Sequence, residues 1–134
     1  QETKKKWFAV RTKPRQEEIA TMHYMRQGFA VYAPRVQSMR RHARKAEKLM
    51  RPLFPGYIFL HLGDGKGLEA IGSTIGAIGP VRFNDYCPPV PDWVIAGIQV
   101  RENDSGYIPL KSLGAVMMKS GAKVTVALGD KEID

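Results

Sequence analysis

The feature that most constrains this chain is the run RPLFPGYIFL at residues 51–60, in which the four consecutive residues 57–60 are apolar. Successive side chains of a β-strand point to opposite faces of a sheet, so a strand over this run is apolar on both faces. Each face then needs a cover that excludes water. A chain of 134 residues can cover one face with its own helices, and the pattern leaves open what covers the other.

Two strand patterns flank a helix pattern in the first part of the chain. Residues 6–12 and 29–36 are rich in alternating strand formers, and residues 13–28 lie between them. Pro14 is placed near the start of this predicted helix and Gly28 at its end, which are the positions where helices favour these residues. The chain is therefore expected to open as strand, helix, strand.

The predicted helix has two distinct faces. Ile19, Met22 and Met25 recur at a helical spacing and predict the stripe that packs inward. Polar residues at spacings of three, four and seven share another face. These are Gln16, His23, Arg26 and Gln27.

The remaining patterns complete a mixed fold. Residues 37–51 are too charged for a core and predict a protruding hairpin. Further along, the patterns predict a turn at 63–67, a short helix or turn at 68–74, a strand at 79–84 and a helix at 91–102 that Pro91 opens or Asp92 caps. This order predicts an α+β fold, in which helices flank a small, largely antiparallel sheet.

Charge and cysteine content limit the partners and the compartment. The chain has 21 Lys and Arg against 13 Asp and Glu, a net charge of +8, which favours a polyanionic partner. A merely basic, soluble surface is the alternative. Cys87 is the single cysteine and no apolar run reaches the roughly 18 residues of a membrane helix, so we expect a cytoplasmic protein without a membrane partner.

Signals for catalysis and for metal or cofactor binding are weak. The glycines and lysine of GDGKG, residues 63–67, lack the spacing of a phosphate-binding loop. His23, His42 and His61 lie far apart in sequence without a metal-binding pattern, and Cys87 sits beside prolines as a small packed or loop residue. We expect no catalytic residues, no metal and no cofactor, and the chain is predicted not to be an enzyme.

Five segments of the chain, in order, carry a resemblance to a known family. KWFAVRTKPRQEE, QGFAVYAPRV, RPLFPGYIFL, STIGAIGPVRF and PVPDWVIAGI resemble the N-terminal (NGN) domain of the NusG family of transcription elongation factors, and are closest in style to its specialised paralogues such as RfaH. PLFPGY at 52–57 is the most specific element. The resemblance implies a non-enzymatic factor that rides on RNA polymerase and suppresses pausing or termination.

The resemblance also implies an answer to the question of the second cover. In such factors an apolar pocket on the sheet docks onto the clamp helices of the largest polymerase subunit. Phe83 and Ile95 are the matching residues most plausibly explained as plain core, whereas Tyr57 and Phe59 together are expected to be exposed as an interaction site. The residues that match the pocket are Phe54, Pro55, Tyr57, Phe59, Phe83, Ile95 and Ile98.

A second implied partner is the non-template DNA strand of the transcription bubble. The residues that match its contacts are Lys13, Gln16, His23, Arg26, Gln27 and Thr74. Four of these already share a predicted helix face, for which an ordinary solvated surface is the alternative. Cations of the predicted hairpin extend the expected nucleic-acid surface, namely Arg40, Arg41 and Arg44. Ile75 departs from the pattern of RfaH, which has Arg there, and GLEA at 67–70 replaces a polar group that contacts the polymerase gate loop.

The expected domain organisation follows from these assignments. We predict an NGN-like, polymerase-binding domain at 6–101, a linker at 102–117 and the start of a truncated KOW-like domain at 118–134. A KOW domain would bring partners of its own, such as the ribosome. Two other function classes stay open, a stand-alone module that binds single-stranded nucleic acid and a basic ribosomal or structural protein.

Overall fold

The computed structural model describes residues 5–63 and 71–109 of the chain. In chain order the elements are β1 (Lys5–Thr12), α1 (Glu17–Arg26), β2 (Ala30–Tyr32), β3 (Arg35–His42), β4 (Lys45–Pro52), β5 (Tyr57–Gly63), β6 (Ala77–Pro80), β7 (Pro89–Val90) and α3 (Asp92–Gln99). A five-stranded antiparallel sheet has the order β2-β5-β1-β6, with β7 also paired to β1. The predicted α+β class is confirmed.

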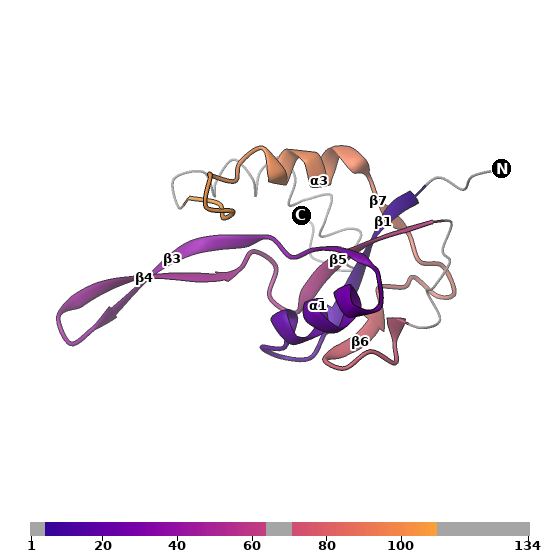
Figure 1. Ribbon diagram of the computed structural model, residues 1–134, viewed down its shortest axis with the longest axis horizontal. Helices are drawn as coiled ribbons and strands as arrows, with labels where there is room; N and C mark the ends of the chain where they lie inside the picture. Colours follow the sequence, from indigo (N-terminus) through magenta and orange to yellow (C-terminus); the bar gives the residue numbers. More distant parts are fainter. Residues whose placement is uncertain (1–4, 64–70, 110–134) are drawn as a thin grey trace.

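The sheet separates the two helices, and a two-stranded ribbon projects from it. α1 and α3 lie on opposite sides of the sheet, while β3 and β4 pair only with each other and extend away from the body (Figure 1). This ribbon is the predicted hairpin of residues 37–51, and it begins two residues earlier, at Arg35. The single strand predicted over 29–36 is instead divided between β2 and the start of β3.

The pairing of β1 with β5 places one apolar set on each face of the sheet. Seven register pairs run from Lys5 opposite Gly63 to Arg11 opposite Tyr57. Because side chains alternate along a strand, neighbours such as Ile58 and Phe59 point to opposite faces, and both are fully buried. The expectation that the strand needs two covers is therefore met.

α1 covers one face of the sheet, and it does so with residues other than the predicted stripe. Ile19, Met22 and Met25 are 40%, 43% and 60% exposed, so the prediction that they pack inward is wrong. The helix instead buries Ala20 and Tyr24 in the cluster on this face. Tyr24 buries its ring, and its hydroxyl donates to the Ile71 carbonyl at 2.6 Å. These two interactions stabilise the rotation of the helix that points Tyr24 inward. The cluster is Phe8, Val10, Ala20, Tyr24, Ile58, Leu60, Leu62, Ile71 and Ala77.

α3 covers the opposite face, so the expectation that a partner supplies the second cover of β5 is wrong. Its residues Val94, Ile95 and Ile98 have 2% of their surface exposed or less and pack with Phe59 in a second cluster. The predicted helix over 91–102 is confirmed in place, although it is shorter, and Pro91 is its N-cap residue without a side-chain cap. The buried members of this apolar cluster are Ala9, Val36, Leu53, Phe54, Phe59, Val81, Val90, Val94, Ile95, Ile98 and Ile108.

The segment after α3 packs against the base of the hairpin. Ile108 has no exposed surface, and its N–H donates to the Arg35 carbonyl at 2.8 Å while its carbonyl accepts from the Gln37 N–H at 2.9 Å. The Asn103 side chain accepts from the Ser105 N–H at 2.9 Å and so closes the turn that leads there. The segment predicted to be a linker from residue 102 therefore packs on the domain as far as Ile108.

Other predictions fall partly or wholly outside the described residues. The strand expected at 79–84 is present as β6 only up to Pro80, and Phe83 and Tyr86 then form an isolated bridge. Residues 64–70 lie outside the described residues, which removes most of the turn expected at 63–67 and the first three residues of the helix or turn expected at 68–74. The predicted KOW-like start at 118–134 lies outside them entirely.

At Gly76, the backbone just before β6 comes close to the start of α1. Its φ of +86° lies in the left-handed region, and a Cβ there would come within 3.0 Å of the Ala20 backbone nitrogen. Gly28 has a similar φ of +95° but nothing within 4 Å of an added Cβ. An added Cβ would therefore meet both backbone strain and crowding at Gly76, but backbone strain alone at Gly28.

We expect Gly76→Ala to lower the free energy of unfolding by about 2 to 4 kcal/mol, since it adds crowding to the strain of a left-handed residue. Gly28→Ala should cost about 1 kcal/mol, from strain alone. Urea denaturation followed by circular dichroism measures both values. Equal losses in the two variants would show that the approach of Gly76 to α1 is unimportant.

Candidate functional site

The structure brings together most of the residues expected to bind polymerase. Phe54, Phe59, Ile95 and Ile98 belong to one buried cluster, and Tyr57 packs against it half-buried. The rings of Phe54 and Phe59 meet edge to face with centroids 6.0 Å apart. Five of the seven predicted residues thus form one apolar assembly beneath α3.

The exposure of this set differs from the prediction. Phe59 has no exposed surface, so the expectation that Tyr57 and Phe59 form an exposed pair is wrong for Phe59. Tyr57 and Phe59 point to the same face of β5, but Phe59 belongs to the buried cluster that contains the α3 residues, whereas Tyr57 at the start of the strand only packs against this cluster. Ile95 is buried, in agreement with the alternative that it is a core residue.

Phe83 and Pro55 lie apart from the cluster. Phe83 is 40% exposed, so the alternative that it is plain core is wrong. It sits in a tight turn in which its N–H donates to the Tyr86 carbonyl at 2.7 Å and its carbonyl accepts from the Tyr86 N–H at 3.0 Å. Pro55 is exposed in the turn between β4 and β5. Both are accessible to a partner.

The PLFPGY turn is held by a carboxylate from α1. Glu17 is only 8% exposed, and its Oε2 accepts from the Gly56 N–H at 2.6 Å. The Gly56 carbonyl accepts from the Thr12 N–H at 2.8 Å, and its φ of +87° favours glycine. Sequence reasoning missed Glu17, because its partner is a backbone group 39 residues away.

The predicted polar patch is partly assembled. Gln27 Nε2 donates to Thr74 Oγ1 at 2.8 Å and to the His23 carbonyl at 3.1 Å. The structure therefore places the end of α1 beside Thr74, and two residues of the implied DNA contact set are in direct contact. Thr74 itself is 7% exposed, so it positions Gln27 and presents little surface of its own. We call His23, Arg26, Gln27 and Thr74 the polar patch.

Lys13 and Gln16 lie at the other end of α1. Lys13 is exposed, and its N–H donates to the Gly76 carbonyl at 2.9 Å. Gln16 is half-buried as the N-cap residue of the helix. A ten-residue helix is about 15 Å long, so these residues extend the patch along the helix and do not join it at one point.

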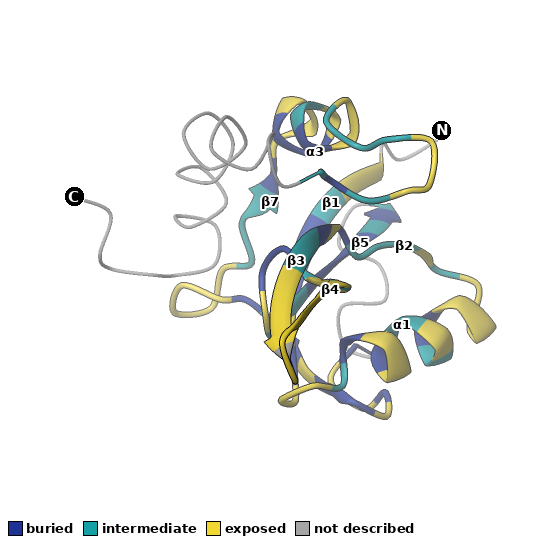
Figure 2. Cartoon of the chain, turned by 90° about the vertical axis from the view of Figure 1, so that its left-hand side faces the viewer, coloured by how far each residue is buried: buried dark blue, intermediate teal, exposed yellow. Residues whose placement is uncertain are grey.

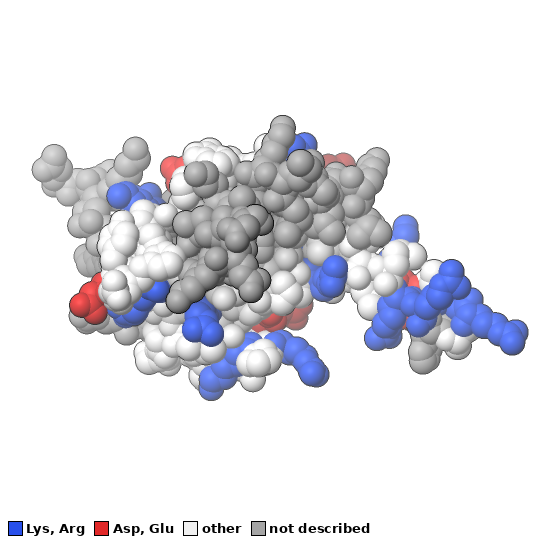
Figure 3. All heavy atoms as spheres, turned by 180° about the vertical axis from the view of Figure 1, so that it is seen from behind, with Lys and Arg blue, Asp and Glu red and all other residues white. Residues whose placement is uncertain are grey.

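The hairpin carries a concentration of cations. Arg41 and Arg44 are exposed, and Arg40 pairs with Glu47 at 3.3 Å on the solvent-facing surface. An exposed pair of this kind contributes little to stability. Figure 3 shows Lys and Arg side chains gathered on the projecting hairpin, where few acidic residues offset them.

An aromatic group that spans the neighbouring strands β1, β5 and β2 escaped the sequence predictions. The Trp7 indole stacks on the His61 ring with centroids 4.5 Å apart and meets Tyr32 edge to face at 6.2 Å. The Tyr32 hydroxyl donates to the Glu102 carboxylate. Burial, followed by this carboxylate, raises the pKa of Tyr32 far above its ordinary value. The pairing depends on strand register, for which the sequence holds no local signal.

The described residues provide neither a metal site nor a membrane-spanning helix. Within 5–63 and 71–109, no group of three or more His, Cys, Asp or Glu side chains could hold a metal ion. In the same ranges, no helix has both the length and the apolar character required to cross a membrane. Cys87 is a free, half-buried thiol.

The comparison with family models agrees with the resemblance to the NusG family. The family model described as "Transcription termination factor nusG" matches residues 5–99. The solved structure described as "Domain interaction in Thermotoga maritima NusG" is similar, with a TM-score of 0.49 and 25% identity. That similarity covers 71% of this chain and 55% of the Thermotoga chain. No curated protein matches the chain.

Tyr24 links the polar patch to the core and makes stability depend on pH. Burial raises the pKa of its phenol from 10 to about 12, while a hydrogen bond with Thr74 acts in the opposite direction. Because the folded-state pKa lies above the unfolded one, the stability contributed by the neutral phenol is complete below pH 10 and is lost between pH 10 and about 12.

We expect Tyr24→Phe to lower the free energy of unfolding by about 1 kcal/mol at neutral pH, because the buried Ile71 carbonyl loses the hydroxyl donor at 2.6 Å and keeps only the Thr74 N–H at 3.3 Å. The variant should also lose less stability than the unmodified chain between pH 10 and 12. Urea titrations at several pH values measure both effects. Parallel pH profiles would show that Tyr24 does not titrate with folding.

Proposed function

The chain belongs to the NusG family of transcription factors, and from that premise we propose that it is an elongation and antitermination factor. In this proposal one surface binds the clamp helices of RNA polymerase and a second contacts the non-template DNA strand. Together these contacts suppress pausing or termination. As a member of this family it acts by binding and not as an enzyme.

The observation that carries the proposal is the separation of the two surfaces by one sheet. The apolar cluster lies on the α3 side, whereas the polar patch belongs to the α1 side (Figure 2). No residue belongs to both proposed sets, although Pro55 and Tyr57 line hollows that residues at the start of α1 also line. A factor of this design can hold the enzyme and its nucleic acid at the same time.

The burial pattern assigns different roles within the proposed polymerase surface. Pro55, Tyr57 and Phe83 are accessible and are proposed to contact the clamp helices directly. Tyr57 begins β5 and Phe83 follows β6, the two strands on either side of β1. The buried residues support these contacts from beneath and are Phe54, Phe59, Ile95 and Ile98.

The proposed DNA surface combines positioning and reading groups. Arg26 and Lys13 are exposed cations suited to phosphates, whereas His23 and Gln27 carry groups that can pair with base edges. The hydrogen bond from Gln27 to Thr74 fixes the amide before DNA arrives. Pre-orientation of this kind lowers the entropic cost of binding.

The hairpin is proposed to add a tether that does not depend on sequence. Arg41 and Arg44 project on an arm beyond the body of the domain, where the phosphate backbone is the natural partner of a cationic surface. Arg40 is partly neutralised by Glu47. Its contribution should therefore be smaller than that of its neighbours.

We expect Tyr57→Ala to weaken binding to core RNA polymerase by about 1 to 3 kcal/mol, as for an aromatic anchor, with a smaller change in unfolding free energy. Tyr86→Ala is the matched control, since Tyr86 is 62% exposed and lies outside the proposed set. Biolayer interferometry against intact polymerase, and against polymerase lacking the clamp helices, measures the affinities. Binding that survives removal of the clamp helices would contradict the proposal.

Two variants separate positioning from sequence recognition on the DNA surface. We expect Arg26→Ala to weaken binding to every non-template sequence and to reduce the salt dependence, because it removes a phosphate contact. His23→Ala should lose about 1 to 3 kcal/mol on the preferred sequence only. Arg82→Ala serves as the control, because Arg82 is an exposed cation outside the patch.

Retention on elongation complexes that carry varied non-template strands measures these effects. Equal binding to all sequences by the unmodified chain would indicate a general factor without a recruitment element. Loss of discrimination in Arg82→Ala as strong as in His23→Ala would show that the polar patch does not read the strand.

A further inference from the structure

The outward side of α1 is apolar, and the proposed function does not use it. Ile19, Met22 and Met25 are between 40% and 60% exposed. Single exposed apolar residues are common, but three on one side of a ten-residue helix form a continuous strip.

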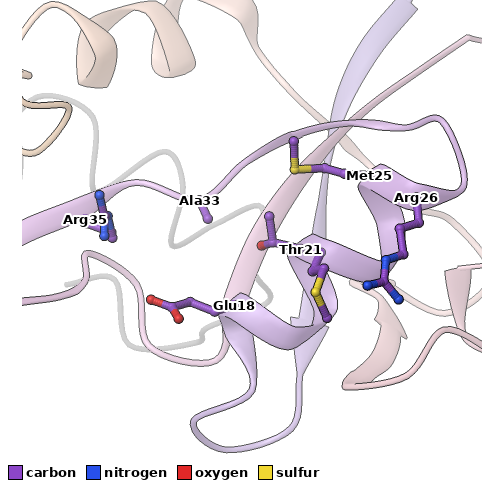
Figure 4. A pocket seen from close by; sticks show the side chains of 7 residues that line it. Glu18, Thr21, Met25, Arg26, Ala33 and Arg35 are labelled. Carbon is purple, nitrogen blue, oxygen red and sulfur yellow. The ribbon is translucent and has the colours of Figure 1, made fainter.

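The exposed strip borders a hollow between α1 and the segment that joins β2 to β3. This hollow has a volume of about 610 Å³, and Met22, Met25 and Ala33 form its apolar lining. Figure 4 shows Arg35 at one end of the hollow and Arg26 at the other, with Met25 reaching toward the chain between β2 and β3.

A second hollow continues the first toward the hairpin. It has a volume of about 390 Å³ and shares Glu18, Ala33 and Arg35 with the first. Ile19 and Met50 supply apolar surface to it. We call the two hollows together the methionine groove.

The register of the hairpin extends the apolar character of this surface along the arm. Met50 lies opposite Gln37, and Met39 lies opposite Lys48 two pairs further out. Pairs two residues apart share a face of a ribbon, so Met39 is on the same face as Met50. Both methionines are exposed, at 48% and 38% respectively.

The rim of the groove is positively charged. Arg15, Arg26, Arg35 and Arg51 line it as exposed cations, whereas Glu18 is the one exposed carboxylate among its described lining residues. Glu17 also lines the groove but is buried and bonded to Gly56. The electrostatic field of the rim therefore selects an acidic partner.

We propose that the methionine groove binds an acidic amphipathic α-helix of a protein partner. Methionine adapts its shape and is favoured where a surface must accept an apolar helix face. The ten-residue α1 offers a track of about 15 Å, enough for nearly three turns of a partner helix. Acidic side chains on the flanks of that helix would meet the arginines of the rim.

The composition of the floor favours a helix over single-stranded nucleic acid. Nucleobases bind mainly by stacking on flat rings, and Tyr57 supplies the one aromatic ring among the described lining residues. The groove also lies on the opposite flank of α1 from the hydrogen bond between Gln27 and Thr74. The helix partner and the DNA strand would therefore both reach Arg26 but would otherwise occupy different sides of α1.

A stapled helical peptide tests the proposal on the full chain without polymerase. The probe has about 14 residues, equal to about 21 Å of helix, with Leu along one stripe and Glu on both flanks. A peptide of the same composition, in which the Leu residues are scattered around the helix, controls for bulk charge. We expect the probe to bind at least about tenfold more tightly than its control, or about 1.4 kcal/mol.

Methyl signals of methionine locate the probe. We expect the ¹³C-methyl signals of Met22, Met25 and Met50 to shift on titration. Met22→Gln with Met25→Gln should weaken binding at least about tenfold. Ile78→Gln, at a 49% exposed residue of β6, should leave it unchanged. Circular dichroism verifies folding, and Met25→Gln alone serves if the double variant unfolds.

Three results would overturn the proposal. Equal affinity for the probe and its scattered control would mean that only charge attracts the peptide. Unchanged affinity in the methionine variants would place the peptide elsewhere. Shifts of the same methyl signals by oligo(dT), with none by the probe, would make the groove a nucleic-acid surface. None of these results depends on binding to polymerase or on the clamp helices.

Discussion

The antiparallel pairing of β1 with β5 is the interaction on which the rest of the structure depends. Their shared register sends Phe8, Val10 and Ile58 to one face and Ala9 and Phe59 to the other. Two apolar faces need two covers, and α1 and α3 supply them. A shift of one residue in this register would exchange the two sets and leave both helices without matching partners.

Two polar contacts join the α1 side of the domain to its turns. Glu17 accepts the Gly56 N–H of the PLFPGY turn, and Gln27 donates to Thr74 at the other end of the helix. Each satisfies a group that is buried or partly buried, where an unpaired donor or acceptor is costly. The helix thus positions both the turn before β5 and the polar patch through these two hydrogen bonds.

This domain has both buried and exposed apolar surface. Beneath α3 it is buried and contributes to stability, whereas along α1 it is exposed in the methionine groove. The exposed strip arises because Tyr24 and Ala20 take the inward side of the helix. A rotation that buried Met22 instead would remove the hydroxyl of Tyr24 from the Ile71 carbonyl. Core packing on one side of the helix therefore creates the surface on the other.

The sequence alone determined the class of fold, the order of most elements and the projecting hairpin, because periodicity and charge are local properties. It also indicated the family. Only the tertiary structure decided which side of α1 is buried, since Ile, Met and Tyr compete for the core by shape and by hydrogen bonding. It likewise decided that Phe59 is covered by α3 and that Glu17 binds Gly56. Those outcomes depend on contacts between residues distant in the chain, which no local pattern encodes.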